Sequence, residues 1–340
     1  MLRMHFSAGR SVTLEERRSR GLVVATKHRP RMGRVQPGEK MAVDPRPVKV
    51  WDRDKGKAIN EFMPDTQTTY ETRPQRSPAQ WLQSTPLFDW LYALYQDAPW
   101  TTRHIEPFVR EHHIDMSEFK PRQYRSYADF FVREFKPGMR RFPDKPTVMG
   151  APAEARYFGW ERFGPDQRFP VKGHSLAAAD ILGGVERAKP FLGGPVLLMR
   201  LSPMDYHHVH YPDDGRTIDH QRLGHRIWTV TWTAVQNKPD IYIRNERQVN
   251  VLETKHFGRL GFVEFGALTV GRIVQRHPLD RPFKRGVQKA VFKFGGSAVA
   301  IFGEPGAWRP TDDILEHTPQ GMETIVRLGE AVALSTRPAA

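Results

Sequence analysis

Apolar residues recur at helical spacing between residues 77 and 135 of the chain. The stretch "SPAQWL" begins with Ser77 as a candidate N-cap and has proline at the first helical position. In "TPLFDWLYALYQD", residues 85–97, leucine and tryptophan return every three or four positions and form an apolar stripe. The stretch "SYADFFVREFKPG", residues 126–138, has a serine cap and ends at Lys-Pro-Gly. This part of the chain is therefore predicted to be helical.

The aromatic stripe within residues 81–95 allows two interpretations. In the first, it packs against the rest of the protein. In the second, it forms an interfacial surface on which Trp and Tyr side chains lie at the depth of lipid headgroups. The spacing of the apolar residues fits both interpretations, so the choice stays open at this point.

From about residue 148 the pattern changes to short runs in which apolar and polar residues alternate. Such runs include "PVLLMRL", "RIWTVTWTAV", "RQVNVLE" and "AVFKF", and glycine and proline separate them. Strands at this spacing are typical of a sandwich or a barrel-like body. We therefore predict an α+β fold in which a helical N-terminal region, residues 50–147, precedes a β-rich catalytic domain, residues 148–340.

Residues 1–49 differ in composition from both of these parts. They contain 12 Lys or Arg against 4 acidic residues and supply more than half of the formal net charge of +14. Proline and glycine interrupt any periodicity, which predicts a flexible basic tail. Such a tail attracts polyanions, either an anionic membrane surface or nucleic acid. Because no helix-turn-helix or aromatic-interleaved pattern follows the tail, a nucleic-acid partner is not expected.

The overall composition excludes several kinds of chemistry. The chain has 340 residues, which is enough to bury a sizeable core, and it contains no cysteine. Disulfides, thiolate metal sites and a cysteine nucleophile are therefore excluded. No run of apolar residues approaches the roughly 20 that cross a bilayer as a helix. The basic tail also lacks the continuous apolar core of a secretory signal.

One predicted strand near the C-terminus is interrupted. In "VFKFGGSAVAIF", residues 291–302, apolar alternation on both sides surrounds Gly295, Gly296 and Ser297. Glycine inside a strand pattern marks a bulge or a close approach of the backbone. The tripeptide is not a G-x-S-x-G elbow, because the serine enters a strand and not a helix. This geometry suits attack of the Ser297 hydroxyl on the carbonyl of its own preceding residue, where glycine leaves the carbonyl unobstructed.

A second polar cluster is "LSPMDYHHVHYPDDG", residues 201–215. Ser-Pro-Met-Asp predicts a short turn after a strand, with the strand resuming near His208. In a straight strand His207 and His210 face opposite sides, whereas a turn between them lets both reach one pocket. Three interpretations stay open: a structural histidine pair, a pair of general acid–base groups, and a metal site. A metal is not expected, because no acidic partner has the spacing of a ligand set.

These motifs together resemble the phosphatidylserine decarboxylase proenzymes. "YRSYADFFVREFKPGMRRF", "VKGHSLAAADILGG", "LSPMDYHHVHYPDDG", "NERQVNVLETKHFGRLGFVEFGALTVGRI" and "FKFGGSAVAIF" are similar to five segments of that family and occur in the family's order. The resemblance covers roughly residues 45–303. It implies a pyruvoyl-dependent decarboxylase of the zymogen type, a lyase of phospholipid biosynthesis.

The resemblance also implies roles for individual residues. The chain cuts itself between Gly296 and Ser297, and Ser297 becomes a covalent pyruvoyl group, which is the cofactor. His210 is the base of self-cleavage, and His207 assists decarboxylation or reprotonation. Glu154, in "APAEARYF", stands where the family has the aspartate that orients the base, and the next position has alanine where the family has glycine. The cleavage segment reads G-G-S-A where the family usually has L-G-S-T.

Several expectations about function follow from the resemblance. The chain is expected to convert phosphatidylserine to phosphatidylethanolamine and CO2 at an anionic membrane surface, as a peripheral protein on the cytoplasmic face of a bacterial inner membrane. The cleaved large and small chains are expected to form a homodimer. Two alternatives are decarboxylation of a soluble aromatic amino acid by the same chemistry, and an inactive homologue that does not cleave.

Overall fold

The computed structural model describes residues 49–61, 91, 93–164, 178–224, 245–266, 272–293 and 297–337. The chain divides into two units, Met1–Asp44 and Pro45–Ala340, and all described residues lie in the second. The predicted basic tail therefore lies outside the described residues, except for its last position. The Gly295-Gly296 pair and most of the two helices predicted between residues 77 and 97 also lie outside them.

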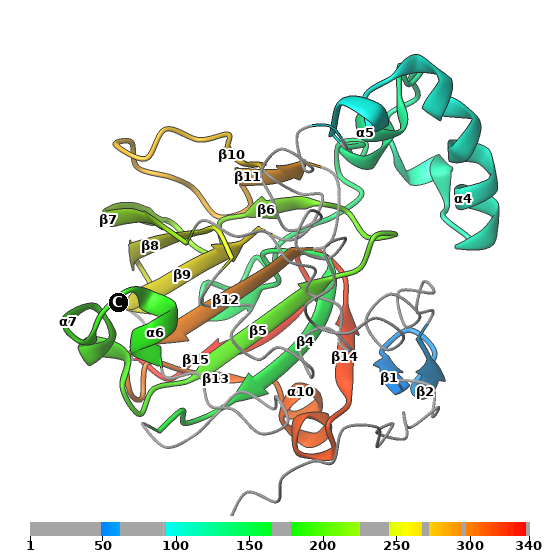
Figure 1. The fold of residues 1–340 in the computed structure, drawn as a ribbon. Coiled ribbons are helices and arrows are strands. Elements are labelled where there is room, and N and C mark those ends of the chain that lie inside the picture. Colours follow the sequence, from blue (N-terminus) through cyan, green and yellow to red (C-terminus); the bar gives the residue numbers. More distant parts are fainter. Residues whose placement is uncertain are drawn as a thin grey trace, which may run out of the picture. The chain divides into compact units, whose positions relative to one another are not determined.

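A nine-stranded sheet forms the centre of the described structure (Figure 1). Neighbouring strands pair antiparallel, except that β1 and β14 are parallel. The strands, in spatial order, are β2 (Lys57–Asn60), β1 (Lys49–Asp52), β14 (Glu323–Val326), β4 (Ala155–Trp160), β5 (Val196–Leu201), β12 (Ser297–Gly303), β9 (Arg259–Phe265), β8 (Arg247–Thr254) and β7 (Gly215–Leu223). Strand β12 lies in the interior of this sheet, where it pairs with β5 and β9 along its length.

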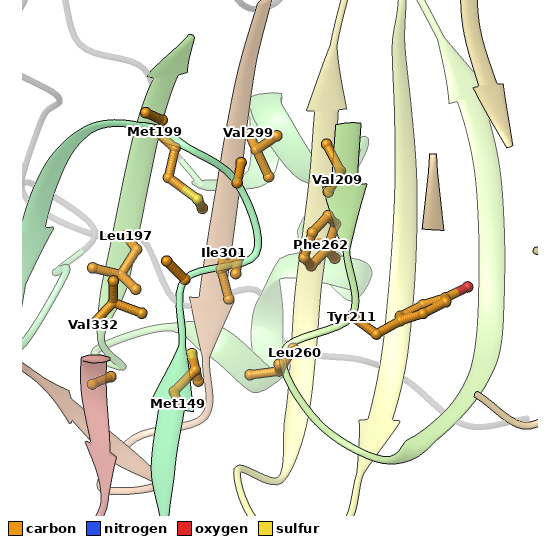
Figure 2. Close-up of a cluster of buried hydrophobic side chains, with 14 of the residues drawn as sticks. Met149, Leu197, Met199, Val209, Tyr211, Leu260, Phe262, Val299, Ile301 and Val332 are labelled. Carbon is orange, nitrogen blue, oxygen red and sulfur yellow. The ribbon is translucent and has the colours of Figure 1, made fainter. Parts of the chain in front are cut away.

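Two smaller sheets share a core with one face of the large sheet. They consist of β10 (Arg272–Gln275), β11 (Gln288–Lys293) and β6 (His208–His210), and of β13 (Trp308–Pro310), β15 (Ala331–Ser335) and β3 (Val148–Gly150). In Figure 2, Met199 on β5 and Val299 on β12 point into the same cluster as Val209 on β6. This sheet-on-sheet packing buries one apolar face of each layer, as in a sandwich.

Short helices contact the opposite face of the large sheet. They are α6 (Ala178–Leu182), α7 (Val185–Ala188) and the 3₁₀ turn η3 (Lys189–Phe191). Their side chains pack with Val263 on β9 and with Ala298 and Phe302 on β12. Successive residues of β12 therefore alternate between the two cores, as period-2 geometry requires.

The described helices between strands β2 and β3 are short. They are η1 (Pro99–His104), α4 (Ile105–Glu111), η2 (Met116–Glu118) and α5 (Tyr127–Phe131), and α10 (Asp312–His317) and η4 (Thr318–Gln320) follow near the C-terminus. The predicted cap of α5 is confirmed, because Ser126 Oγ accepts a hydrogen bond from the Asp129 backbone at 3.1 Å. The fold is α+β with substantial sheet content. A predominantly helical N-terminal region is not supported by the described residues.

Candidate active site

Ser297 is the first residue of β12 and lies opposite Leu201, the last residue of β5. Its side chain is fully buried. It has the same parity along the strand as Val299 and Ile301, which belong to the core shared with the smaller sheets. The hydroxyl therefore faces the layer that contains β6. Gly296, the other half of the predicted cleavage site, lies outside the described residues.

The predicted turn after β5 is confirmed. The Asp205 backbone donates to the Ser202 carbonyl at 2.9 Å, and the Asp205 carboxylate accepts from the Ser202 backbone at 2.6 Å. The chain then resumes as an extended segment, and the His207 carbonyl accepts from the Phe292 backbone at 2.9 Å. Because β5 ends beside the start of β12, this turn delivers the histidines to the end of the sheet where Ser297 lies.

His207 is the histidine that contacts Ser297. Its Nδ1 lies 3.4 Å from Ser297 Oγ, and its ring stacks on Phe131 with the ring centroids 3.9 Å apart. The ring is fully buried, and among the described residues its Nε2 has no hydrogen-bond partner. Burial lowers the pKa of His207 well below its usual value, and the positive charge of Arg133 lowers it further. His207 is therefore neutral at physiological pH and can accept a proton from the serine.

His210 makes different contacts. Its Nδ1 lies 2.8 Å from the Gly286 carbonyl, which can only accept, so this nitrogen carries the proton in the neutral ring. The unprotonated Nε2 lies 3.5 Å from the Tyr206 hydroxyl. Burial lowers the pKa of His210 as well. Strand alternation separates the rings of His207 and His210, and in the described part of the chain they share no hydrogen-bond partner.

His208 is held on both sides of its ring. Its Nε2 donates to the Val132 carbonyl at 3.2 Å, and its Nδ1 contacts the Gln288 amide. The ring stacks on Tyr206 with the ring centroids 4.5 Å apart. Burial lowers the pKa of His208 to about 4. With both nitrogens occupied and the ring neutral, His208 serves to hold the segment in place.

Glu154 binds an arginine. Its Oε2 accepts from Arg140 Nε at 2.9 Å and from the Leu328 backbone at 3.4 Å, and Arg140 also pairs with Glu118 at 2.8 Å. Among the described contacts of the Glu154 carboxylate there is no histidine. Its role in orienting the base therefore stays a prediction, and its observed partner is Arg140 from the "KPGMRRF" segment.

Three consecutive residues at the end of α5 and directly after it contact the histidine segment and were not predicted to do so. Phe131 covers His207, the Val132 carbonyl binds His208, and Arg133 Nη2 donates to the Met204 carbonyl at 2.6 Å. The signal was present in "FFVREF", which places one arginine inside an apolar run of a predicted helix. Arginine in such a position needs a specific partner or function.

Behind the turn, five buried charged side chains form a cluster. Arg156 lies 2.7 Å from Glu61 and also binds the Asp205 carboxylate, and Arg200 pairs with Glu61 and with Glu323, each at 2.5 Å. Burial raises the pKa of Asp205, and the Arg156 charge partly offsets this effect. The cluster fixes Asp205 and with it the turn that leads to His207.

Comparisons with known proteins agree with the motifs around this site. A model of the phosphatidylserine decarboxylase family matches residues 127–334, which is more than half of the chain. A phosphatidylserine decarboxylase proenzyme of Chlamydia pneumoniae is 31% identical over 270 residues, covering 79% of this chain and 90% of the relative. Proteins of the same name from Fusobacterium nucleatum and Ruminiclostridium cellulolyticum are 32% and 29% identical, over 72% and 78% of this chain and 82% and 89% of the relatives.

Proposed function

Because the chain belongs to the phosphatidylserine decarboxylase family, we propose that it is a self-cleaving proenzyme that converts phosphatidylserine to phosphatidylethanolamine and CO2. The observation that carries the proposal is the contact between Ser297 Oγ and His207 Nδ1, 3.4 Å apart in a fully buried site. A buried hydroxyl beside a neutral imidazole is suited to lose its proton as it attacks a carbonyl.

Self-cleavage follows from these groups. As the proton of Ser297 Oγ passes to a histidine, the oxygen attacks the carbonyl of the preceding residue. The C–N bond breaks, and the amide becomes an ester with a free amino group. Loss of the Ser297 α-proton breaks the Cβ–O bond and releases the upstream chain as a carboxylate. The remaining dehydroalanine takes up water and loses ammonia, which leaves a pyruvoyl group.

The residues around Ser297 fit a pyruvoyl group. Leu201 on the neighbouring strand and Val299 on the same face of β12 are buried, and the His207 ring lies within reach. The group supplies an electron sink for the electron pair that CO2 leaves behind. The chain's own contribution is to bury the substrate's reacting atoms and to hold a proton on His207 for return to the α-carbon. Residues on β12 and β5 keep this position rigid, because both strands lie in the interior of the large sheet.

The proposal also concerns which histidine acts in self-cleavage and which in reprotonation. The resemblance implies His210 as the base of self-cleavage and His207 as the group for reprotonation. A specific observation supports the exchange of these roles, since His207 and not His210 contacts Ser297. A comparison of the His207→Ala and His210→Ala variants shows which histidine has which role. The variant that stays uncleaved lacks the base of self-cleavage, and the variant that cleaves but does not release CO2 lacks the group for reprotonation.

The experiment that tests the proposed function uses the full chain and its Ser297→Ala variant. A denaturing gel of the purified wild-type protein is expected to show two chains, and the variant one. With vesicles of phosphatidylserine, only the cleaved protein is expected to release CO2. Cleavage without CO2 release from the lipid, but with release from a free aromatic amino acid, would identify the soluble alternative. An uncleaved wild-type protein that melts cooperatively would identify an inactive homologue.

Exposed apolar residues between positions 91 and 100 support contact with a lipid surface. The exposed fractions are 52% for Leu91, 51% for Leu94 and 59% for Trp100. Among the described residues no helix is both long and apolar enough to cross a bilayer. The protein is therefore proposed to bind the membrane peripherally, by the interfacial interpretation of the aromatic stripe. Trp100→Ser is expected to weaken sedimentation with anionic vesicles, while Trp51→Ser, at a ring packed on His317, is the control.

The homodimer and the cytoplasmic face of the inner membrane remain part of the proposal. The mass of the cleaved protein in solution tests the first, and fractionation of the producing cells tests the second. Neither outcome affects the chemistry at Ser297.

A further inference from the structure

Arg133 is buried beside the candidate active site, and no carboxylate among the described residues lies within ion-pair distance of it. Its side chain is 1% exposed, and its guanidinium lies between the rings of Phe119 and Phe130, at 4.7 and 4.9 Å from their centroids. Nε and Nη1 have no hydrogen-bond partner within the part of the chain that the structure describes. In the described part of the chain no ion pair to Arg133 is found. Burying such a charge is costly, so its position needs an explanation.

The contacts of Arg133 lie on the turn that leads to His207. Nη2 donates to the Met204 carbonyl at 2.6 Å and approaches the Asp205 carbonyl at 3.2 Å. Two residues earlier, Phe131 stacks on the His207 ring. One short segment therefore holds both the backbone before His207 and the ring itself.

We propose that Arg133 is a positioning residue, which locks the turn at Met204 and Asp205 and thereby holds the His207 ring against Ser297. This inference rests on the proposed function for one point, the chemical role of His207. The positioning of the His207 ring by Arg133 can be tested without it. Loss of Arg133 frees the two carbonyls, and the ring loses the fixed backbone from which it reaches Ser297 Oγ.

The charge of Arg133 has a second effect on His207. The groups that face this ring are Arg133 from the segment after α5, His208 on its own strand, the Ser297 hydroxyl from β12, and the Ser202 and Pro203 carbonyls from the turn. After burial, Arg133 is the largest cause of the lowered pKa of His207, and the Pro203 carbonyl acts in the opposite direction. Removal of the arginine charge therefore raises the pKa of His207, and a larger fraction of the ring is protonated in mild acid.

The test begins with the uncleavable Ser297→Ala protein, so that it does not depend on catalysis. The imidazole nitrogens of His207 are followed by NMR as the pH is lowered, with and without Arg133→Met. We expect the midpoint of His207 to rise by about one pH unit in Arg133→Met, the size expected for loss of one nearby charge. Arg133→Lys, which keeps the charge, is expected to restore a midpoint close to that of the Ser297→Ala parent.

The second readout is the rate of self-cleavage in the chain with Ser297, followed by pulse-chase during cell-free synthesis at several pH values. Arg133→Met is expected to slow cleavage, or CO2 release by the cleaved enzyme, about tenfold at neutral pH, and its rate is expected to begin to fall in acid at a higher pH than in the parent chain. Arg133→Gln, which can still donate to the carbonyls, is expected to recover the rate at pH 8 but to keep the earlier decline in acid. If Arg133→Met does not fold, the Arg133→Gln and Arg133→Lys variants still show whether Arg133 positions His207 and lowers its pKa.

Arg247 provides a matched control. It is also buried, and it donates to the Ile181 and Asp180 carbonyls at 2.8 Å each, away from the histidine segment. Arg247→Met is expected to lower the melting temperature without moving the His207 midpoint. An unchanged His207 midpoint and rate in folded Arg133→Met would overturn the inference while leaving the proposed function intact. Failure of the wild-type chain to cleave would overturn the proposed function, and the NMR result would still decide the role of Arg133.

Discussion

Two sets of buried charges meet at the turn formed by Ser202–Asp205, and they differ in how their partners are arranged. On one side, Glu61, Arg156, Asp205, Arg200 and Glu323 each lie within ion-pair distance of an opposite charge. On the other side, Arg133 and His207 are equally buried, yet among the described residues Arg133 has no ion pair and His207 Nε2 has no hydrogen-bond partner. The ion pairs fix the Asp205 side chain, whereas Arg133 binds the Met204 and Asp205 carbonyls that lead to the imidazole beside Ser297.

The comparison predicts that the two sets respond differently to substitution. Changes in the paired cluster should reduce stability, because removal of one partner leaves the other charges buried and alone. Changes around His207 should alter the rate of cleavage and its pH dependence at nearly constant stability.

The largest effect is expected from Arg200→Met. The substitution leaves Glu61 and Glu323 without the guanidinium that both contact, and we expect a loss of about 3–5 kcal/mol in the free energy of unfolding. Urea denaturation of the uncleavable Ser297→Ala protein measures it. Arg110→Met removes an ion pair with Glu106 that is more than three-quarters exposed on both sides, and it should leave the midpoint unchanged. Equal midpoints for both variants would contradict the structural role of the cluster.

Phe131→Leu tests the other side of the turn. The ring that stacks on His207 is lost, while an apolar side chain still fills most of the space. We expect cleavage or CO2 release to slow about five- to tenfold, with a change in unfolding free energy of about 1 kcal/mol. Pulse-chase and urea denaturation give the two values. A large loss of stability at an unchanged rate would place Phe131 with the structural group.

The pH dependence is the third prediction. Burial lowers the pKa of both His207 and His210, so whichever of them is the base stays unprotonated as the pH falls below 6.5, the usual value. The rate of cleavage is therefore expected to be nearly flat between pH 8 and 6 and to decline only in stronger acid. A rate that halves near pH 6.5 would mean that the base has an ordinary histidine pKa.

Glu154→Gln is expected to have the smallest effect. The carboxylate lies against Arg140, which keeps a second partner in Glu118 when Glu154 is replaced. We expect cleavage to slow by less than about threefold, within the range of a partly exposed ion pair. A variant that stays uncleaved would show that Glu154 orients the base directly, as the resemblance implies.

Much of the site could be predicted from local sequence. Ser126 caps α5, the turn after "LLMRL" forms at Ser202–Asp205, and Ser297 begins a strand, because each depends on residues close together in the chain. The turn lies before His207 and not between the two histidines, so alternation separates His207 from His210, three positions along the extended segment. The sequence therefore indicated which residue types gather at the end of the central sheet.

The partners of these residues could not be predicted in the same way. Phe131 and Arg133 are more than 70 positions from His207, and their contact depends on how α5 packs on the turn. The partners of Arg200, Glu61 and Glu323, lie at opposite ends of the described structure in sequence, and no local pattern links them. Nothing in the spacing of "APAEA" indicated that Arg140 would bind Glu154.

The intact mass of the purified wild-type protein tests the conversion of Ser297 most directly. The account predicts two polypeptides, of which the smaller begins at position 297 and is lighter by one ammonia than the same chain with an N-terminal serine. Ser297→Ala should give one polypeptide of full length. A folded wild-type protein of full-length mass, or a small chain that begins with an unmodified serine, would contradict the proposal that Ser297 becomes the catalytic group.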